Sequence, residues 1–240
     1  MVDDDSIERL FFELSSESRL DILRELREKS LKMQEVARRL DVTATEAFRQ
    51  LQRLSEAQLV QRQPDGSYFT TSYGKLVLHL TTSLGVASKY KEYFLAHDVW
   101  RLPIQFIDRI GEISETSLIM DTMESISKVE QIIGGAEEYV WGIGEGRFTE
   151  TMGKIAMEQS GRGVEYKVLS PLPAGRMQSL ENRTLSDIPL VMALTEKEAV
   201  ICLPFTDGRM DYAGFSGKDP MFLSWAKDLF VFYWDEGKRA

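Results

Sequence analysis

The chain contains little cysteine and little histidine. Its 240 residues include one cysteine and two histidines. A single cysteine cannot form a disulfide within the chain, and Cys202 lies in an apolar run, 199–205, that is typical of a buried strand. A redox-sensing thiol is the alternative. Three such residues far apart cannot supply the usual zinc ligand sets, so we expect no metal and no cofactor.

Long hydrophobic runs and a leader sequence are also missing. No segment approaches the ~18 consecutive apolar residues that a membrane span needs. Residues 1–5 have neither a basic flank nor an apolar stretch, so no secretory signal is expected. We therefore expect a cytoplasmic protein with no membrane partner. The composition, 43% hydrophobic and 10% aromatic, is sufficient for a folded core, and the length favours two domains.

No enzyme motif is complete in this sequence. The segment 142–146 resembles a phosphate-binding loop, but no Lys-Ser/Thr pair follows it, and Arg147 stands where the GxGxxG pattern needs its third glycine. There is also no set of nucleophile, base and metal ligand. We therefore expect that the protein is not an enzyme.

The charge of the chain is unevenly distributed. The formal net charge is −9. Residues 30–75 contain seven basic and five acidic side chains and so carry +2, which leaves −11 for the rest of the chain. A locally positive segment on an acidic body is compatible with DNA binding, because the body is repelled by the phosphate backbone.

Residues 15–74 have the order of parts of a winged helix-turn-helix. The expected parts are helices beginning at Ser16 and Ser30, a turn at 41–43, a recognition helix capped by Thr43, and a hairpin around Pro64-Asp65-Gly66. Such a unit places one helix in the major groove of DNA and a hairpin, the wing, beside it. We therefore expect a DNA-binding domain over residues 1–75.

The spacing of the recognition helix separates an inner from an outer face. Its apolar positions are expected to face inward: Ala47, Phe48, Leu51 and Leu54. The positions expected to face outward are Thr45, Glu46, Arg49, Gln50, Gln52 and Arg53. The expected contacts to double-stranded DNA lie on this helix and on the wing: Thr43, Thr45, Arg49, Gln50, Arg53, Arg62 and Tyr68. Arginine can pair with guanine and glutamine with adenine, each good pair contributing about 1–3 kcal/mol of discrimination. Ordinary solvated arginines are the alternative.

A long helix is expected from Ser72 to about His97, since apolar residues recur there every three or four positions. We assign residues 76–115 to a linker through which two copies pair as a homodimer, because two-fold dimers double the contact with DNA. Packing of this helix on its own domain is the alternative.

From about Leu118, helices alternate with strands, which predicts an α/β sensor domain over residues 116–240 and an α+β protein overall. Strands are expected at 139–143, 164–169, 191–194 and 199–203, with 211–215 as an edge strand, 174–187 as a polar connection, and a final helix at 221–234. Ligands in such sheets bind at the carboxyl ends of strands. The candidates there for an anionic or polyol effector are Trp141, Glu145, Arg147, Ser170 and Arg183. The alternative is that Trp141 belongs to the core and Arg147 to the surface.

Several segments resemble known regulators. Residues 15–23 resemble ArsR-type winged-helix regulators. Residues 54–60 (LSEAQLV), 65–74 (DGSYFTTSYG), 91–98, 102–111 and 225–234 look like the archaeal transcriptional regulators best known from the filament-associated regulator of methanogenesis. Gln58 departs from that pattern, because the family usually has glycine there, where a helix end commonly needs a left-handed residue.

The resemblance implies a sequence-specific, homodimeric DNA-binding regulator with a C-terminal effector domain. That domain is similar to a non-catalytic phospholipase D-like sheet. Enzymes of that fold need His-x-Lys motifs, whereas here His79 and His97 are followed two places later by Thr81 and Val99. A second class of function remains open, in which the winged helix docks to the transcription machinery without reading DNA.

Overall fold

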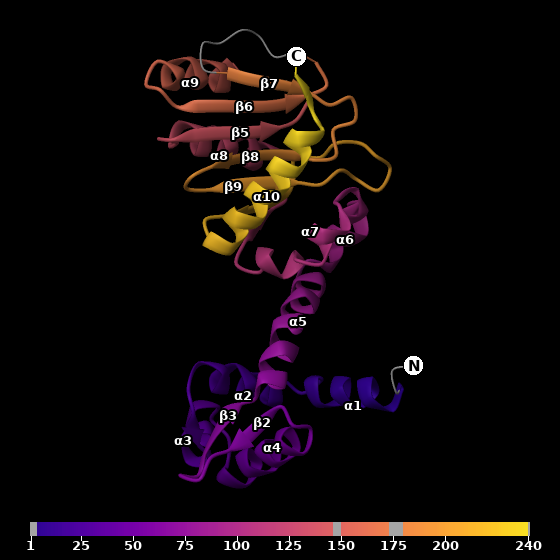
Figure 1. The fold of residues 1–240 in the computed structure, drawn as a ribbon, viewed down its shortest axis with the longest axis vertical. Helices are drawn as coiled ribbons and strands as arrows, with labels where there is room; N and C mark the ends of the chain where they lie inside the picture. Colours follow the sequence, from indigo (N-terminus) through magenta and orange to yellow (C-terminus); the bar gives the residue numbers. More distant parts are fainter. Residues whose placement is uncertain (1–3, 146–149, 173–179, 240) are drawn as a thin grey trace. The chain divides into compact units, whose positions relative to one another are not determined.

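The structure is a computed structural model that describes residues 4–145, 150–172 and 180–239. It is a mixed α+β protein whose chain divides into two compact units, Met1–Thr82 and Ser83–Ala240 (Figure 1). Helix α5 (Ser72–Lys89) begins in the first unit and ends in the second. The segment 76–115, expected to be a linker, is therefore shared between the two units.

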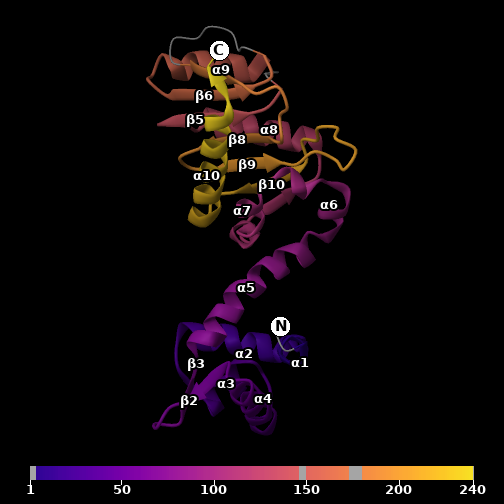
Figure 2. The same cartoon turned by 45° about the vertical axis from the view of Figure 1, so that its right-hand side comes forward.

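Within the described residues, the first unit contains the helices α1 to α4, the beginning of α5 and a small sheet. The elements are α1 (Asp4–Leu14), α2 (Glu17–Glu28), β1 (Leu31–Lys32), α3 (Met33–Arg39), α4 (Ala44–Glu56), β2 (Val60–Arg62) and β3 (Ser67–Thr70). The strands form an antiparallel sheet in the order β1-β3-β2. The β2–β3 hairpin of this sheet is labelled in Figure 2. Leucine, isoleucine and alanine side chains from α2 and α4 fill the core, because each helix repeats them every three or four residues.

The β2–β3 hairpin is tightened by its turn residues. Gly66 has a φ of +85°, a conformation that costs glycine little. An Asp65 carboxylate oxygen accepts hydrogen bonds from the Ser67 backbone N–H at 2.9 Å and from its hydroxyl at 2.7 Å. These bonds lower the pKa of Asp65. The hairpin expected around residues 64–66 is confirmed.

Gln58 occupies the left-handed position that follows α4. Its φ is 59°, which a residue with a Cβ adopts at a cost of roughly 1–2 kcal/mol. We expect Gln58→Gly to raise the free energy of unfolding by about 0.5–1 kcal/mol, less than that cost because glycine also gains entropy in the unfolded chain. Urea denaturation checks this. Gln58→Ala is the control, since it keeps the Cβ, and equal stability of both variants would contradict the explanation.

The second unit is built on an eight-stranded mixed sheet. Its strands are β4 (Ser117–Ile119), β5 (Tyr139–Ile143), β6 (Glu165–Ser170), β7 (Leu180–Thr184), β8 (Val191–Thr195), β9 (Ala199–Cys202), β10 (Gly214–Gly217) and β11 (Lys238–Arg239). Their order is β11-β7-β6-β5-β8-β9-β10-β4, with β5, β6 and β7 parallel and the other pairs antiparallel.

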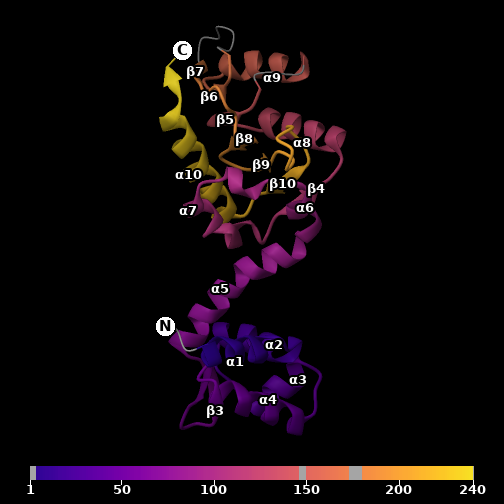
Figure 3. The same ribbon diagram turned by 90° about the vertical axis from the view of Figure 1, so that its right-hand side faces the viewer.

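Helices cover both faces of this sheet. Helix α10 (Pro220–Glu236) crosses one face, while α8 (Thr122–Gly134) and α9 (Glu150–Ser160) lie on the other (Figure 3). The α10 face also receives the end of α5, α6 (Lys91–Ala96), α7 (Ile104–Ile107) and the short 3-10 helix Ile110–Ile113. Residues 83–113 therefore contribute side chains, among them Val86, Tyr93 and Phe106, to the core of the second unit.

Three expectations about the second unit were wrong. The long helix ends at Lys89 and restarts at Lys91, so it does not continue unbroken to His97. Strand β10 begins at Gly214 and lies between β9 and β4, so it is an interior strand. The polar connection contains β7, whose mostly polar sequence lacks the alternation that would have marked it as a strand.

Candidate nucleic-acid interface and ligand cavity

Helix α4 presents one polar face to solvent. The hydroxyl of Thr43 accepts a hydrogen bond from the Glu46 backbone N–H at 3.1 Å, which confirms Thr43 as the N-cap. The buried positions Ala47, Leu51 and Leu54 are 0% exposed. On the opposite side, Thr45, Phe48, Arg49 and Gln52 are exposed. This exposed face of α4 is the candidate interface of the first unit.

The expected positions of Phe48 and Gln50 are reversed in the structure. Phe48 is 52% exposed, whereas Gln50 is 7% exposed. The buried stripe follows positions 47, 50, 51 and 54, and residue 48 lies about 100° away from residue 47 around the helix. Gln50 is accommodated because it accepts a hydrogen bond from Arg19 Nη1 at 3.1 Å and donates one to Glu46. Its side chain is thus not available to a base edge.

Arg49 is the exposed cation at the centre of this face. Its side chain is 69% exposed and pairs with Glu46 at 2.7 Å. Hydrogen bonds from Gln50 and Arg49 lower the pKa of Glu46. Because an exposed pair of this kind contributes little stability, Arg49 can exchange its carboxylate for another anion at small cost.

Arg53 is committed to a contact within the protein. It donates to both carboxylate oxygens of Glu13, at 2.7 and 3.2 Å, and lies over the ring of Phe12 at 5.0 Å from the centroid. The Glu13 carboxylate also meets Arg19 Nε at 3.1 Å. Arg53 thus ties α4 to α1, and its expected role as a DNA contact competes with this bidentate pair.

The pair makes the first unit sensitive to acid. The hydrogen bond from Arg53 is the main cause that lowers the pKa of Glu13 below its ordinary value. Burial acts in the opposite direction and raises the pKa, while the positive charge of Arg19 lowers it further. A carboxyl whose pKa is lower in the folded state stabilises the fold above its unfolded pKa, and this contribution is lost as the pH falls through the folded pKa.

We expect the Glu13→Gln variant to have a lower free energy of unfolding than wild type. This difference should be largest above pH about 5. The difference should shrink as the pH falls below about 4.5, where the carboxyl becomes protonated in the unfolded chain and then in the folded one. Urea denaturation at pH about 7, 5 and 3 measures it. A difference that stays constant over this range would contradict the assignment.

The two wing residues differ in accessibility. Arg62 is exposed at the end of β2 and lies over the Tyr68 ring at 6.0 Å from the centroid. Tyr68 is 8% exposed and belongs to the core of the first unit. Within the described residues, no carboxylate pairs with Arg62, so it is the wing residue that remains open to a ligand.

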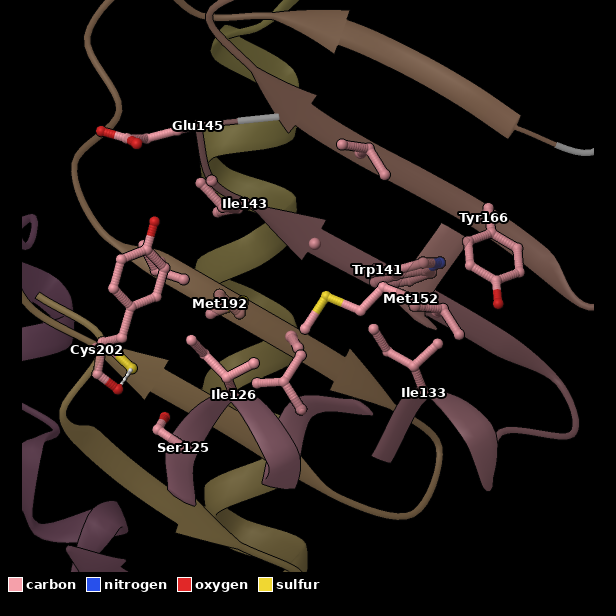
Figure 4. Close-up of a pocket in the computed structure, with 18 residues that line it drawn as sticks. Ser125, Ile126, Ile133, Trp141, Ile143, Glu145, Met152, Tyr166, Met192 and Cys202 are labelled. Carbon is pink, nitrogen blue, oxygen red and sulfur yellow. Dashed lines mark hydrogen bonds between the residues drawn. The ribbon is translucent and has the colours of Figure 1, made fainter. Parts of the chain in front are cut away.

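The second unit contains a cavity of about 190 Å³ between α8, α9 and the sheet (Figure 4). In Figure 4, Ile126 and Ile133 extend from α8 toward the strands, and Met152, a residue of α9, lies near them. Most of the side chains around it are apolar: Ile126, Val129, Ile133, Val140, Met152, Val168 and Val191.

The cavity exists because two small residues face each other across neighbouring strands. Gly142 on β5 is paired with Ala193 on β8 and with Val168 on β6. A Cβ placed on Gly142 would meet only the Met192 backbone oxygen, at 3.5 Å. The absent side chain of Gly142 therefore leaves the space open.

Two polar groups beside the cavity, the Tyr166 hydroxyl and the Cys202 thiol, already have partners. The Tyr166 hydroxyl donates to Gln159 Oε1 at 2.5 Å, and Cys202 Sγ donates to the Tyr212 backbone oxygen at 3.1 Å. Burial raises the pKa of the Cys202 thiol to about 12, so the thiol is neutral and unreactive at ordinary pH. Over the described part of the chain, the only buried side-chain nitrogen or oxygen without a partner is Arg183 Nε.

The structure does not bring the expected effector residues together. Trp141 stacks on Phe230 of α10, at 5.0 Å between centroids, so its ring lies on the face opposite the cavity. Ser170 is buried and donates to the Leu172 backbone oxygen at 2.6 Å. Arg183 donates to the Trp234 backbone oxygen at 2.7 Å, at the end of α10. Glu145 lies at the edge of the cavity, and Arg147 is outside the described residues.

His97 is held in the second unit by a structural network. Its Nδ1 lies 2.8 Å from the Tyr93 backbone oxygen and its Nε2 lies 2.9 Å from an Asp211 carboxylate oxygen. The ring stacks on Tyr93 and Phe205. Its carboxylate partner is thus Asp211, not the adjacent Asp98. Nowhere in the described ranges do three histidine, cysteine, aspartate or glutamate side chains gather in a way that could hold a metal ion.

The sequence pattern did not reveal several of the residues that define the candidate sites. Phe48 belongs to the exposed face of α4, and the 47-50-51-54 spacing could have revealed this, whereas the outward position expected for Gln52 is confirmed. The cavity depends on Gly142, Ala193 and Cys202, which lie on three different strands. A glycine within a strand pattern was the one local signal of such a space.

Comparison with known proteins gives a partial family match and distant structural similarities. The model of a family described as HVO_A0261 N-terminal domain matches residues 7–89. No curated protein matches the sequence. Nor does any described helix have the length and apolar character needed to cross a membrane.

Three solved structures resemble parts of the chain. One is TrmBL2, an archaeal chromatin protein, at 19% identity over 88% of each chain with a TM-score of 0.45. Another is NucT from Helicobacter pylori, at 11% identity over 52% of this chain and 98% of that chain, with a TM-score of 0.42. The third is Nuc from Salmonella typhimurium, a phospholipase D family member, at 11% identity over 48% and 89%, with a TM-score of 0.37. Likeness at this level carries no functional argument.

Proposed function

We propose that the protein is a sequence-specific DNA-binding transcriptional regulator whose first unit is a winged helix-turn-helix. The observation that carries the proposal is the exposed face of α4, which follows α3 after a short turn and lies in the same unit as an exposed hairpin bearing Arg62. In helix-turn-helix proteins the second helix of the pair enters the major groove.

The side chains on this face suit base-edge contacts. Arg49 can pair with guanine, Gln52 with adenine, and the methyl group of Thr45 can contact thymine. Phe48, exposed between them, can also contact a thymine methyl group. Arg62, exposed on the hairpin, can contact the phosphate backbone or the minor groove. The backbone N–H groups at the start of α4, which Thr43 caps, favour phosphate.

Docking to another protein is the second candidate, and Phe48 is the observation that favours it. An exposed aromatic side chain on a polar face is typical of protein-interface hot spots as well as of base contacts. The two candidates differ in their response to salt, because DNA binding weakens steeply as counterions are added.

The test is fluorescence anisotropy with DNA from upstream of the protein's own gene, against an unrelated duplex of equal length, at about 50 and 200 mM salt. We expect a preference of about a hundredfold for the upstream duplex. Arg49→Ala combined with Gln52→Ala should reduce this affinity by at least about 30-fold, since two base contacts of about 1–3 kcal/mol each are removed.

Arg24→Ala is the matched control. Arg24 is 65% exposed and pairs with Asp21 three residues earlier, much as Arg49 is 69% exposed and pairs with Glu46. The control removes the same charge from α2 and should leave the preference unchanged. Equal losses in both variants would mean that only net charge matters. Absence of binding to either duplex at low salt would favour the docking module.

We also propose that the regulator acts as a homodimer. Leu76, Leu80 and Leu84 recur every four residues on α5 and are 55%, 59% and 56% exposed, respectively. Such an apolar stripe supports pairing of the helix with its twin in a second copy. Sedimentation equilibrium tests this. Wild type should sediment as a dimer and Leu76→Glu with Leu80→Glu as a monomer, whereas a monomeric wild type would overturn the assignment.

The second unit is the proposed receiver of the signal. Its cavity lies within a sheet domain separate in the chain from the DNA-binding unit, which suits a domain whose ligand alters DNA binding.

A further inference from the structure

We infer that the cavity between α8, α9 and the sheet binds a compact apolar molecule, such as a single aromatic ring with at most one neutral polar group. This inference rests on the proposal that the second unit receives a small-molecule signal. It replaces the expectation of an anionic or polyol effector.

The size of the cavity sets the size of the ligand. Its volume is about 190 Å³. An apolar cavity of about 150 Å³ is enough to hold a benzene molecule. A ring with one or two small substituents therefore fits, while a disaccharide or a nucleotide does not.

The polarity of the lining sets the chemistry of the ligand. Apolar side chains from α8, α9 and four strands surround the space, and the hydroxyl of Tyr166 and the thiol of Cys202 already donate to protein acceptors. A polyol placed here would lose its hydrogen bonds to water and find few replacements, at a cost that grows with each hydroxyl group. An apolar ring loses nothing by leaving water.

The charge of the lining disfavours an anion. Among the residues that line the cavity, Glu145 is the only one with a formal charge, and it lies at the edge beyond Gly144. No cation among these residues balances a carboxylate or phosphate, and a buried unpaired anion is costly. The ligand is therefore neutral in the part that the cavity encloses.

The test is isothermal titration calorimetry of the full chain, without DNA, with three probes: p-cresol, 4-methylbenzoate and glucose. The first two share a methyl-substituted ring and differ in charge. We expect p-cresol to bind with a dissociation constant of about 0.1–1 mM, 4-methylbenzoate at least about tenfold more weakly, and glucose without measurable binding. Because DNA is absent, failure of the DNA-binding proposal would not alter this result.

Two further measurements locate the binding. In the chain labelled with [methyl-13C]methionine, p-cresol should shift the signal of Met152, which lines the cavity, and leave Met33 of the first unit unchanged. Gly142→Val should weaken p-cresol binding at least about tenfold by filling the space. Gly85→Val is the control, since a Cβ on Gly85 meets open space and Gly85 lies on α5, outside the lining of the cavity.

The outcomes are decisive in either direction. The inference is overturned if p-cresol shows no saturable binding, if glucose or 4-methylbenzoate binds more tightly, or if binding leaves Met152 unshifted. The methionine measurement uses the wild-type chain, so it decides the matter even if Gly142→Val does not fold.

Discussion

Gly214→Ala is expected to lower the free energy of unfolding of the second unit by at least about 3 kcal/mol, the upper end of the usual cost of overpacking. A Cβ on Gly214 would stand 2.1 Å from the Ile201 backbone oxygen and 2.7 Å from Cys202 Cα. Both are backbone atoms of the neighbouring strand β9, so neither can rotate away as a flexible side chain would.

The position of the strand amplifies this effect. Strand β10 is paired on both sides, with β9 and with β4, and any shift that relieves the clash breaks hydrogen bonds on one side. Circular dichroism and urea denaturation measure the loss. Gly85→Ala, where the added Cβ meets open space in a helix, is the control and should be neutral or stabilising by up to about 1 kcal/mol. A loss below about 1 kcal/mol in Gly214→Ala would show that the sheet can yield.

Arg19→Met is expected to destabilise the first unit by about 3–5 kcal/mol, the usual result of removing one partner from a buried pair. Arg19 is 8% exposed. Its guanidinium donates to the backbone oxygens of Phe12 and Glu13, both at 2.7 Å, and to Gln50 at 3.1 Å. Methionine keeps the aliphatic part of the side chain. It leaves the backbone oxygens of Phe12 and Glu13, at the end of α1, and the buried Gln50 amide oxygen without the guanidinium that donates to them.

The consequence should reach the proposed DNA interface. Gln50 lies in α4 and Arg19 lies in α2. Arg19→Met removes the hydrogen bond between these two side chains, which orients α4 against α2. Urea denaturation and the anisotropy assay together measure the effect. Arg24→Ala is the control, because Arg24 lies on the exposed side of α2, the helix that also carries Arg19. It should change the free energy of unfolding by less than about 1 kcal/mol. Equal effects of the two substitutions would contradict the role of Arg19, and partial rescue by Arg19→Lys would show how much depends on charge alone.

Local patterns predicted much of the fold. The apolar spacing of α2 and α4, the Thr43 cap, the turn at Pro64-Asp65-Gly66 and the strands β5, β6, β8 and β9 were all visible in the sequence. These features depend on residues within about one helical turn or one strand of each other, where periodicity is a reliable signal. Strand β7 was not visible, because its mostly polar side chains are selected by its place in the sheet.

The candidate sites were only partly predictable. The choice of Arg49 and Thr45 needed only their positions on α4. The burial of Gln50 needed Arg19, which is 31 residues away, and the commitment of Arg53 needed Glu13, which is 40 residues away. The sequence contains all these residues but not their distances from one another.

The sequence by itself determined most of the helices and strands, together with the Thr43 cap and the turn at 64–66, because these choices follow from short-range sterics and hydrophobic periodicity. Only the tertiary structure decided which polar side chains are buried and what space remains between elements. Burial of Gln50 depends on donors and acceptors supplied by distant residues. The cavity depends on Gly142 and Ala193 meeting across two strands, so its apolar character, and hence the kind of ligand it admits, arises from packing.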